Sequence, residues 1–158
     1  MTTIAYDRVT RTIGADSRNT DNTGQVFLCN KIERLSDGRY FLGSGHGLTI
    51  SKVKQWAEGE FREANRPDFD ELFNEDTADN FSMSCLIISE DGDTVILVDA
   101  EMVPLEVLDE YLGVGSGGAS ARAALAAGAD MLKAIEIAIK YDGNSGGPVC
   151  IRRIGETQ

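Results

Sequence analysis

The sequence predicts an α+β domain in which helices lie outside antiparallel sheets. The expected elements follow in the order strands, helix, strands, two helices, strand, instead of alternating one by one. Short turn signals join neighbouring strands as hairpins. The chain has 158 residues, 42% of them hydrophobic, which is enough to bury one core. We therefore expect a single domain spanning residues 1–158.

The first third of the chain has the pattern of strands. Residues 3–6 and 11–15 are short, apolar-rich stretches separated by a polar turn. Residues 16–24 are polar and rich in turn formers, which predicts a loop. Strand character resumes over residues 25–35 and 39–44, and the Ser-Asp-Gly turn between them indicates a hairpin.

The middle of the chain changes from strand to helical periodicity. Apolar residues recur at helical spacing over residues 49–64, which predicts an amphipathic helix. Pro67 interrupts it, and the acidic stretch that follows fits a short helix at 69–73. Residues 82–89 and 94–98 form a second predicted hairpin across an acidic, Gly-containing turn.

The last third combines a strand, two helices and a final strand. Residues 111–114 are a short strand that runs into a glycine-rich turn. An Ala-rich helix over 119–127 comes next. Apolar residues from Met131 to Ile139 then form one helical face. Residues 148–154 complete the chain as a strand.

Composition excludes several classes of function. The net charge of −11 repels phosphate backbones and anionic lipid, so neither a nucleic acid nor a membrane surface is an expected partner. No apolar run reaches the length of a membrane span, and the start lacks a secretory pattern, so a cytoplasmic location is expected. Three widely spaced cysteines indicate buried thiols in a reducing compartment, and one histidine, His46, excludes a His-rich metal site.

A glycine motif over residues 113–118 fits the dinucleotide pattern G-x-G-x-x-G. That fold needs a parallel sheet continuing beyond the motif, and only 40 residues follow Gly118. A tight helix entry, with Ser116 or Ser120 near the helix cap, is the favoured interpretation.

Residues 143–148 (Gly-Asn-Ser-Gly-Gly-Pro) resemble the nucleophile segment of chymotrypsin-like serine proteases. His46, an aspartate such as Asp93 or Asp99, and Ser145 even follow that family's order. However, helical pattern precedes this segment, and His46 comes just before a predicted helix. A serine protease using Ser145 and His46 is therefore an alternative and not the main hypothesis.

A third arrangement begins at the N-terminus. Removal of Met1 before the small residue Thr2 would give Thr2 both a hydroxyl nucleophile and a free α-amine to act as base. The α-amine has an ordinary pKa of about 7.7–8.0, and a nearby lysine ammonium would lower it further. A buried carboxylate would hold the lysine, and backbone N–H groups of a glycine turn would stabilise the oxyanion.

Seven collinear segments supply these parts and resemble proteasome β-type subunits and HslV-type peptidases, within the N-terminal-nucleophile hydrolases. The segment over residues 13–20 (Ile-Gly-Ala-Asp-Ser-Arg-Asn-Thr) is the most specific of them. The resembling segments are residues 2–5, 13–20, 31–35, 41–47, 87–92, 115–118 and 141–147. The chain departs from the family in its short length, in having His46 within the glycine turn, and in the acidic stretch at 68–80.

The resemblance implies a role for each matched residue. Thr2 is the nucleophile, Lys31 the catalytic lysine, Asp16 its anchor and Gly45 the oxyanion donor. Ser116, Asp142 and Ser145 are implied as supporting residues around the threonine, and Thr20, Gly43 and Gly47 as substrate-binding residues. His46 is expected to be structural or to line a pocket.

The resemblance also implies a four-layer αββα sandwich and a threonine-type peptidase that forms an acyl-enzyme. Expected partners are a peptide or unfolded protein substrate and further copies of the chain in a ring, and an ATPase unfoldase partner is left open. Neither a metal nor an organic cofactor is implied. Two rivals from other classes are a structural ring protein without turnover, which a retained Met1 would favour, and a small-molecule amidase of the same fold.

Overall fold

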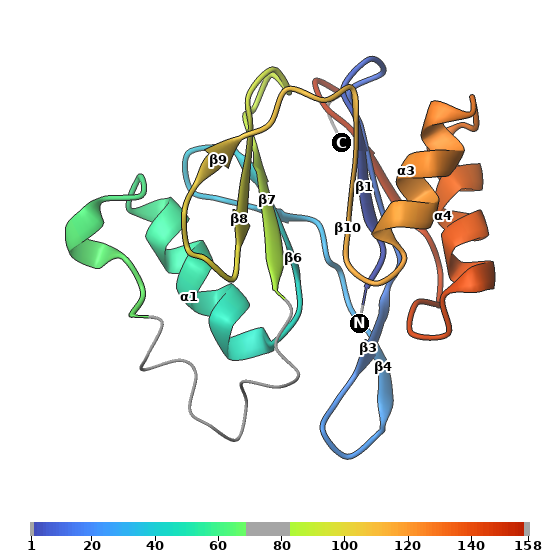
Figure 1. Ribbon diagram of the computed structural model, residues 1–158, viewed down its shortest axis with the longest axis horizontal. Helices are drawn as coiled ribbons and strands as arrows, with labels where there is room; N and C mark the ends of the chain where they lie inside the picture. Colours follow the sequence, from blue (N-terminus) through green and yellow to red (C-terminus); the bar gives the residue numbers. More distant parts are fainter. Residues whose placement is uncertain (1, 69–82, 157–158) are drawn as a thin grey trace.

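The computed structural model describes residues 2–68 and 83–156 (Figure 1). In this part of the chain the strands form two larger sheets and one hairpin, and every ladder is antiparallel. The four-stranded sheet has the order β10 (Tyr111–Val114), β1 (Ile4–Asp7), β2 (Thr12–Ala15), β11 (Cys150–Arg153). The five-stranded sheet has the order β5 (Glu33–Arg34), β6 (Tyr40–Ser44), β7 (Ser84–Ile88), β8 (Val95–Asp99), β9 (Leu105–Glu106). The hairpin joins β3 (Arg18–Thr20) to β4 (Val26–Leu28).

Helices cover the outward faces of the two larger sheets (Figure 1). Helix α1 (Gly47–Glu58) packs on the five-stranded sheet, and the 3₁₀ turn η1 (Glu63–Asn65) follows it. Helices α3 (Gly118–Ala126) and α4 (Met131–Tyr141) pack on the four-stranded sheet. None of the helices described is long and apolar enough to cross a bilayer.

Alternation along the strands separates three apolar clusters. Ile4 and Tyr6 of β1 face the other sheet, together with Leu42 of β6, whereas Ala5 faces helices α3 and α4. Phe41, next to Leu42, faces helix α1. This period of two is what a strand covered on both faces requires, and it explains why the central strands are apolar at nearly every position.

Local sequence explains where the helices begin and end. The Asp130 side chain caps α4 by accepting a hydrogen bond from the Lys133 N–H at 2.8 Å. Helix α4 also packs directly on β2, because a Cβ on Gly14 would lie 2.5 Å from the sulfur of Met131. Helix α1 ends at Glu58, and the N–H of the next residue, Gly59, still donates to the Gln55 carbonyl at 3.2 Å.

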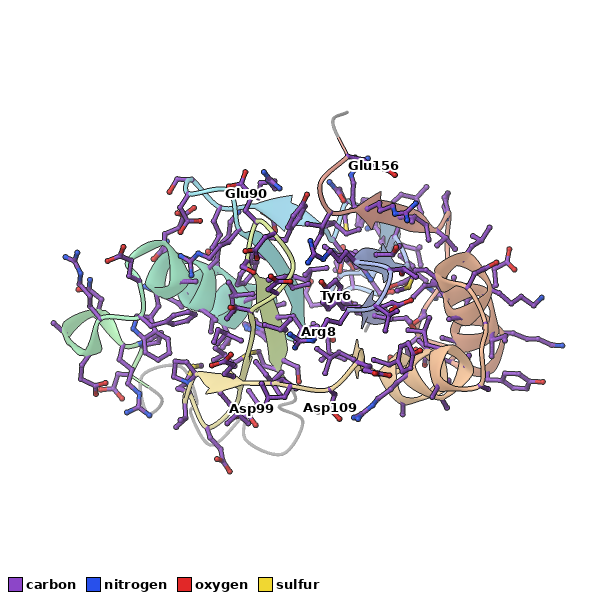
Figure 2. The ribbon with its side chains drawn as sticks, turned by 90° about the horizontal axis from the view of Figure 1, so that it is seen from above. Tyr6, Arg8, Glu90, Asp99, Asp109 and Glu156 are labelled. Atoms are coloured by element: carbon purple, nitrogen blue, oxygen red, sulfur yellow. The ribbon has the colours of Figure 1, made fainter. Side chains whose placement is uncertain are left out.

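At one end of the space between the sheets, the side chains of Tyr6 and Arg8 donate hydrogen bonds to backbone carbonyls of the facing loops. We refer to this region as the distal end. The Tyr6 hydroxyl donates to the Gly92 carbonyl at 2.7 Å, across the two sheets. The Arg8 guanidinium donates to the carbonyls of Asp93, Val107 and Asp109. Figure 2 looks onto this end and shows Tyr6 and Arg8 between the layers.

The α+β class predicted from the sequence is confirmed, with corrections to individual elements. The predicted loop at 16–24 is wrong in part because it contains β3, which pairs with β4. The predicted strand at 25–35 is two strands, because residues 29–32 leave the hairpin before β5 begins. The predicted helix at 49–64 is shorter, from Gly47 to Glu58, and β9 was not predicted. The helix suggested at 69–73 lies outside the described residues.

Candidate active site

Thr2, Lys31 and Asp16 meet at the end of the sheets opposite the distal end. The Lys31 ammonium nitrogen lies 2.9 Å from Thr2 Oγ1 and 2.8 Å from Asp16 Oδ1. All three residues are buried, and the Asp16 side chain is fully so. A buried ammonium needs a paired carboxylate to offset its lost hydration, and Asp16 supplies it. The threonine hydroxyl therefore lies next to a fixed positive charge.

The backbone around Thr3 and Gly146 fixes the Asp16 carboxylate. Asp16 Oδ1 accepts the Thr3 N–H at 2.8 Å, and Oδ2 accepts the Gly146 N–H at 3.0 Å. The Asp16 N–H in turn donates to the Thr3 carbonyl at 3.0 Å, which extends the β1–β2 ladder. With the Lys31 bond, the carboxylate has three charge-assisted hydrogen bonds and a single orientation.

A second carboxylate, Asp142, follows the end of helix α4. Its Oδ2 accepts hydrogen bonds from Ser116 Oγ at 2.6 Å and Ser145 Oγ at 2.5 Å, and its Oδ1 accepts the Asn144 N–H at 3.1 Å. Burial opposes ionisation, but the hydrogen bonds from Ser116 and Ser145 outweigh it, so the pKa of Asp142 lies below its ordinary value. Asp142 is therefore an acceptor-only carboxylate at neutral pH.

A glycine turn between β10 and α3 closes over the Thr2 backbone. Gly115 has a φ of +86°, and a Cβ there would lie only 2.0 Å from the Thr2 carbonyl oxygen. The same oxygen accepts the Gly117 N–H at 3.3 Å. A larger residue at Gly115 would push this turn away from Thr2. The glycines at 115–118 are thus explained by close approach to Thr2, and antiparallel β10 and helix α3 provide no dinucleotide fold around them.

Gly45, the predicted oxyanion donor, lies in an exposed turn between β6 and α1 with a φ of +122°. Ser44, which precedes it, has its Oγ beside Gly115, so this turn borders the Thr2 site. His46 is exposed, and its side chain makes no capping bond at the start of α1.

The serine-protease arrangement is not assembled. Ser145 Oγ is hydrogen-bonded to Asp142 and to Thr3 Oγ1, at 2.5 and 2.7 Å, and not to His46. A triad requires the histidine between the serine and an aspartate. In addition, the antiparallel sheets with outer helices are not the double β-barrel of that family.

The predicted substrate-binding residues lie outside the hydrogen-bonded group. Thr20 is exposed on β3, and Gly47 is the exposed first residue of α1. Gly43 lies in β6, where a Cβ would be 2.4 Å from Ile50. Residue type did not single out Thr3, Gly117 and Gly146, which contact the site through backbone N–H groups and, for Thr3, also through its hydroxyl. Their proximity in sequence to Thr2, Ser116 and Ser145 was the only available signal.

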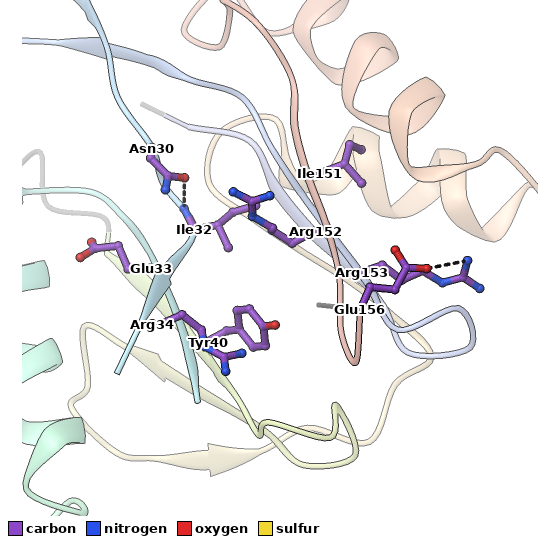
Figure 3. A pocket seen from close by; sticks show the side chains of 9 residues that line it. All are labelled: Asn30, Ile32, Glu33, Arg34, Tyr40, Ile151, Arg152, Arg153 and Glu156. Carbon is purple, nitrogen blue, oxygen red and sulfur yellow. Dashed lines mark hydrogen bonds and ion pairs between the residues drawn. The ribbon is translucent and has the colours of Figure 1, made fainter. Parts of the chain in front are cut away.

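An open cavity of about 790 Å³ lies between edge strands β5 and β11 and contains none of these predicted residues (Figure 3). Asn30 and Ile32, on either side of Lys31, line it, together with Arg34, Arg152 and Arg153 among others. Among residues 2–68 and 83–156 there is no cluster of three or more His, Cys, Asp or Glu side chains able to hold a metal. Thr2, Lys31 and Asp16 are not among the residues that line this cavity.

Comparison with known proteins supports the resemblance at the level of the fold. No protein-family model matches the sequence, and a search of curated proteins finds no match. Among solved structures, the chain resembles eukaryotic HslV from Trypanosoma brucei with a TM-score of 0.67 and 22% sequence identity. The match covers 95% of this chain and 97% of that one. The structural similarity to HslV expected from the sequence motifs is thus confirmed, and it shows that the chain has an HslV-like fold.

Proposed function

We propose that this protein is a threonine-type peptidase in which Thr2, freed by removal of Met1, attacks peptide bonds. One observation carries the proposal: the Lys31 ammonium nitrogen is 2.9 Å from Thr2 Oγ1 and 2.8 Å from Asp16 Oδ1. The ion pair with Asp16 is enough to compensate the buried charge of Lys31, so the additional contact with the Thr2 hydroxyl points to a role in the reaction. A buried, paired lysine beside a hydroxyl is the arrangement expected around an activated nucleophile.

The reaction has two balanced halves. In the first, Thr2 Oγ attacks the substrate carbonyl, its proton passes to the free α-amine, and the C–N bond breaks as that proton is transferred to the leaving amine. The product is an ester between Thr2 and the acyl part of the substrate. In the second half, the α-amine deprotonates a water molecule that hydrolyses the ester and restores Thr2. Lys31 supplies the positive charge that favours a neutral α-amine and an ionising hydroxyl.

The surrounding groups have supporting roles. The Gly45 N–H is proposed to stabilise the oxyanion, since its turn borders Thr2 through Ser44 and Gly115. Ser116, Asp142 and Ser145 hold the other side of the Thr2–Thr3 segment through short hydrogen bonds. None of these steps requires a metal or an organic cofactor.

The proposal extends to architecture and partners. We interpret the chain as a single domain and its layers as a four-layer αββα sandwich, since α1 covers one sheet and α3 and α4 cover the other. The HslV-like fold supports a ring of identical subunits that cleaves peptides or unfolded proteins, with an ATPase unfoldase as a further candidate partner. A cytoplasmic location fits this activity.

N-terminal sequencing of the purified protein, combined with a peptidase assay, tests the proposal. We expect Thr2 at the N-terminus of an active preparation and no turnover by Thr2→Ala. Activity in a preparation with Met1 intact would contradict the mechanism, because the α-amine would then belong to another residue. A processed but inactive protein would favour the structural ring protein instead.

A further inference from the structure

Thr3 links the two carboxylates that flank the candidate nucleophile. Its N–H donates to Asp16 Oδ1 at 2.8 Å, on the Lys31 side. Its hydroxyl lies 2.7 Å from Ser145 Oγ, on the Asp142 side. The residue has no exposed surface, so it cannot touch a substrate directly. Any effect of Thr3 on the reaction must therefore act through its neighbour Thr2.

The direction of the hydroxyl bonds follows from counting protons. Asp142 is ionised at neutral pH and can only accept. Ser145 Oγ, 2.5 Å from Asp142 Oδ2, must donate its only proton there. The Thr3 hydroxyl then donates to Ser145 Oγ, and the bonds run in one direction from Thr3 through Ser145 to Asp142. Thr3→Val would keep the shape of the side chain but remove the hydrogen bond from Thr3 to Ser145.

The glycine turn leaves room for this hydroxyl and little else. A Cβ on Gly117 would lie 1.9 Å from Thr3 Oγ1, and the Gly117 N–H donates to the Thr2 carbonyl at 3.3 Å. Gly117 therefore packs closely against both residues of the Thr2–Thr3 segment. Threonine is branched at Cβ, so few χ1 rotamers are open to it. A hydrogen bond that fixes the position of the Thr3 hydroxyl therefore also restricts the backbone to which the side chain is attached.

We propose that Thr3 is a positioning residue that holds Thr2 Oγ1 at the Lys31 ammonium, through its N–H to Asp16 and its hydroxyl to Ser145. The inference rests on the proposed function, in which Thr2 is the nucleophile. It adds a residue buried beneath the site, whose hydroxyl controls the reactivity of Thr2 without contacting the substrate.

The test compares Thr3→Val with Thr3→Ser in the full-length protein, using a β-lactone probe and a fluorogenic peptide. We expect Thr3→Val to react with the probe about 10- to 100-fold more slowly, as small misplacements of reacting groups do. The final labelled fraction should be unchanged, and kcat should fall while KM stays constant. Thr3→Ser, which restores the hydroxyl, should recover to within about three-fold of the wild-type rate. Intact mass confirms Met1 removal in each variant.

A purely structural role would lower the final labelled fraction and leave the rate constant per active site unchanged, and that result would overturn the proposal. So would a wild-type labelling rate in Thr3→Val. Thr12→Val makes the same substitution at the far end of the β1–β2 hairpin and should leave the rate unchanged.

If the wild-type protein is not labelled at Thr2, the proposed function fails. The Thr3 inference is then decided by hydrogen exchange at the Thr3 and Gly117 amides, which should be about ten-fold faster in Thr3→Val than in Thr3→Ser. Equal exchange rates would overturn it.

Discussion

Polar side chains form hydrogen bonds at both ends of the space between the sheets, but their partners differ. At the distal end, the Tyr6 hydroxyl and the Arg8 guanidinium donate to backbone carbonyls of the facing loops. At the other end, Lys31 and Asp16 form a buried ion pair that also holds the hydroxyl of Thr2. The acceptors at the distal end are backbone carbonyls, which take no part in a reaction. The bonds around Thr2 end on a group that can react.

The comparison indicates which residues serve stability and which serve reactivity. A hydroxyl bonded to a carbonyl contributes about 1 kcal/mol and needs no charge. A buried ion pair is a weak source of stability, because desolvation offsets most of its attraction. Removing one member of that pair leaves the other charge buried and unpaired, so such a variant loses stability as well as activity. Substitutions at the distal end should therefore change unfolding and leave activity nearly unchanged, whereas substitutions around Thr2 should reduce or abolish activity.

The largest effect is expected from the ion pair. Lys31→Ala and Asp16→Asn should each abolish peptide turnover while circular dichroism shows a folded protein, because the charge beside Thr2 is lost or no longer fixed. Lys54→Ala is the matched control, since Lys54 of helix α1 forms a partly exposed salt bridge with Glu33 of strand β5. Wild-type turnover in Lys31→Ala would refute its role.

A smaller loss is expected at Ser145. Ser145→Ala should slow turnover by about 10²-fold, as for a proton-relay or positioning group, and should still allow labelling of Thr2. His46→Ala should have a mild effect, because His46 is exposed and outside the hydrogen-bonded group. Complete inactivation of both variants in a peptidase assay would favour the serine-protease hypothesis instead.

The smallest effect on activity is expected at the distal end. Tyr6→Phe removes the bond to the Gly92 carbonyl, so the free energy of unfolding in urea should fall by about 1 kcal/mol. Peptide turnover should stay within about two-fold of wild type, because Tyr6 lies at the opposite end of β1 from Thr2. A loss of turnover as large as that of Ser145→Ala would show that the two ends are coupled.

Tyr6 also gives the distal end a pH dependence. Burial raises the pKa of Tyr6 to about 12, whereas the unfolded chain has a value of about 10. The neutral phenol is thus favoured in the folded state, so its contribution to stability is complete below pH 10 or so and is lost as the pH rises towards about 12. Urea unfolding at about pH 9 and pH 11 should show a smaller loss for Tyr6→Phe than for wild type. Equal losses would contradict this assignment.

Sequence patterns predicted the elements whose formation depends on residues close together in the chain. The antiparallel hairpins and helices α3 and α4 followed from turns and apolar spacing, and β10 agrees residue for residue with the predicted strand at 111–114. Strand β3 was missed because its residues are polar and only partly covered, so no apolar alternation marks it. Its pairing with β4 is a tertiary feature.

The residues of the candidate site likewise fall into those that the sequence identifies and those that only the structure reveals. Thr2, Asp16 and Lys31 were identified from their residue types within motifs, and the structure places the Lys31 ammonium within hydrogen-bond distance of both Thr2 and Asp16. Gly117 and Gly146 donate backbone N–H groups, and Thr3 contributes both its N–H and its hydroxyl. The contacts of Gly117 with Thr2 and of Gly146 with Asp16 join positions more than a hundred residues apart, and residue type alone does not reveal them.

The central claim is that Thr2 is the nucleophile, and adduct mapping tests it most directly. The protein is incubated with a β-lactone or a peptide epoxyketone, digested, and analysed by peptide mass spectrometry. We predict an adduct on the N-terminal peptide at Thr2, with Met1 absent, and its loss in Thr2→Ala, because no other residue would carry both the hydroxyl and the α-amine. An adduct on the peptide containing Ser145, with Thr2 unmodified, would contradict the account.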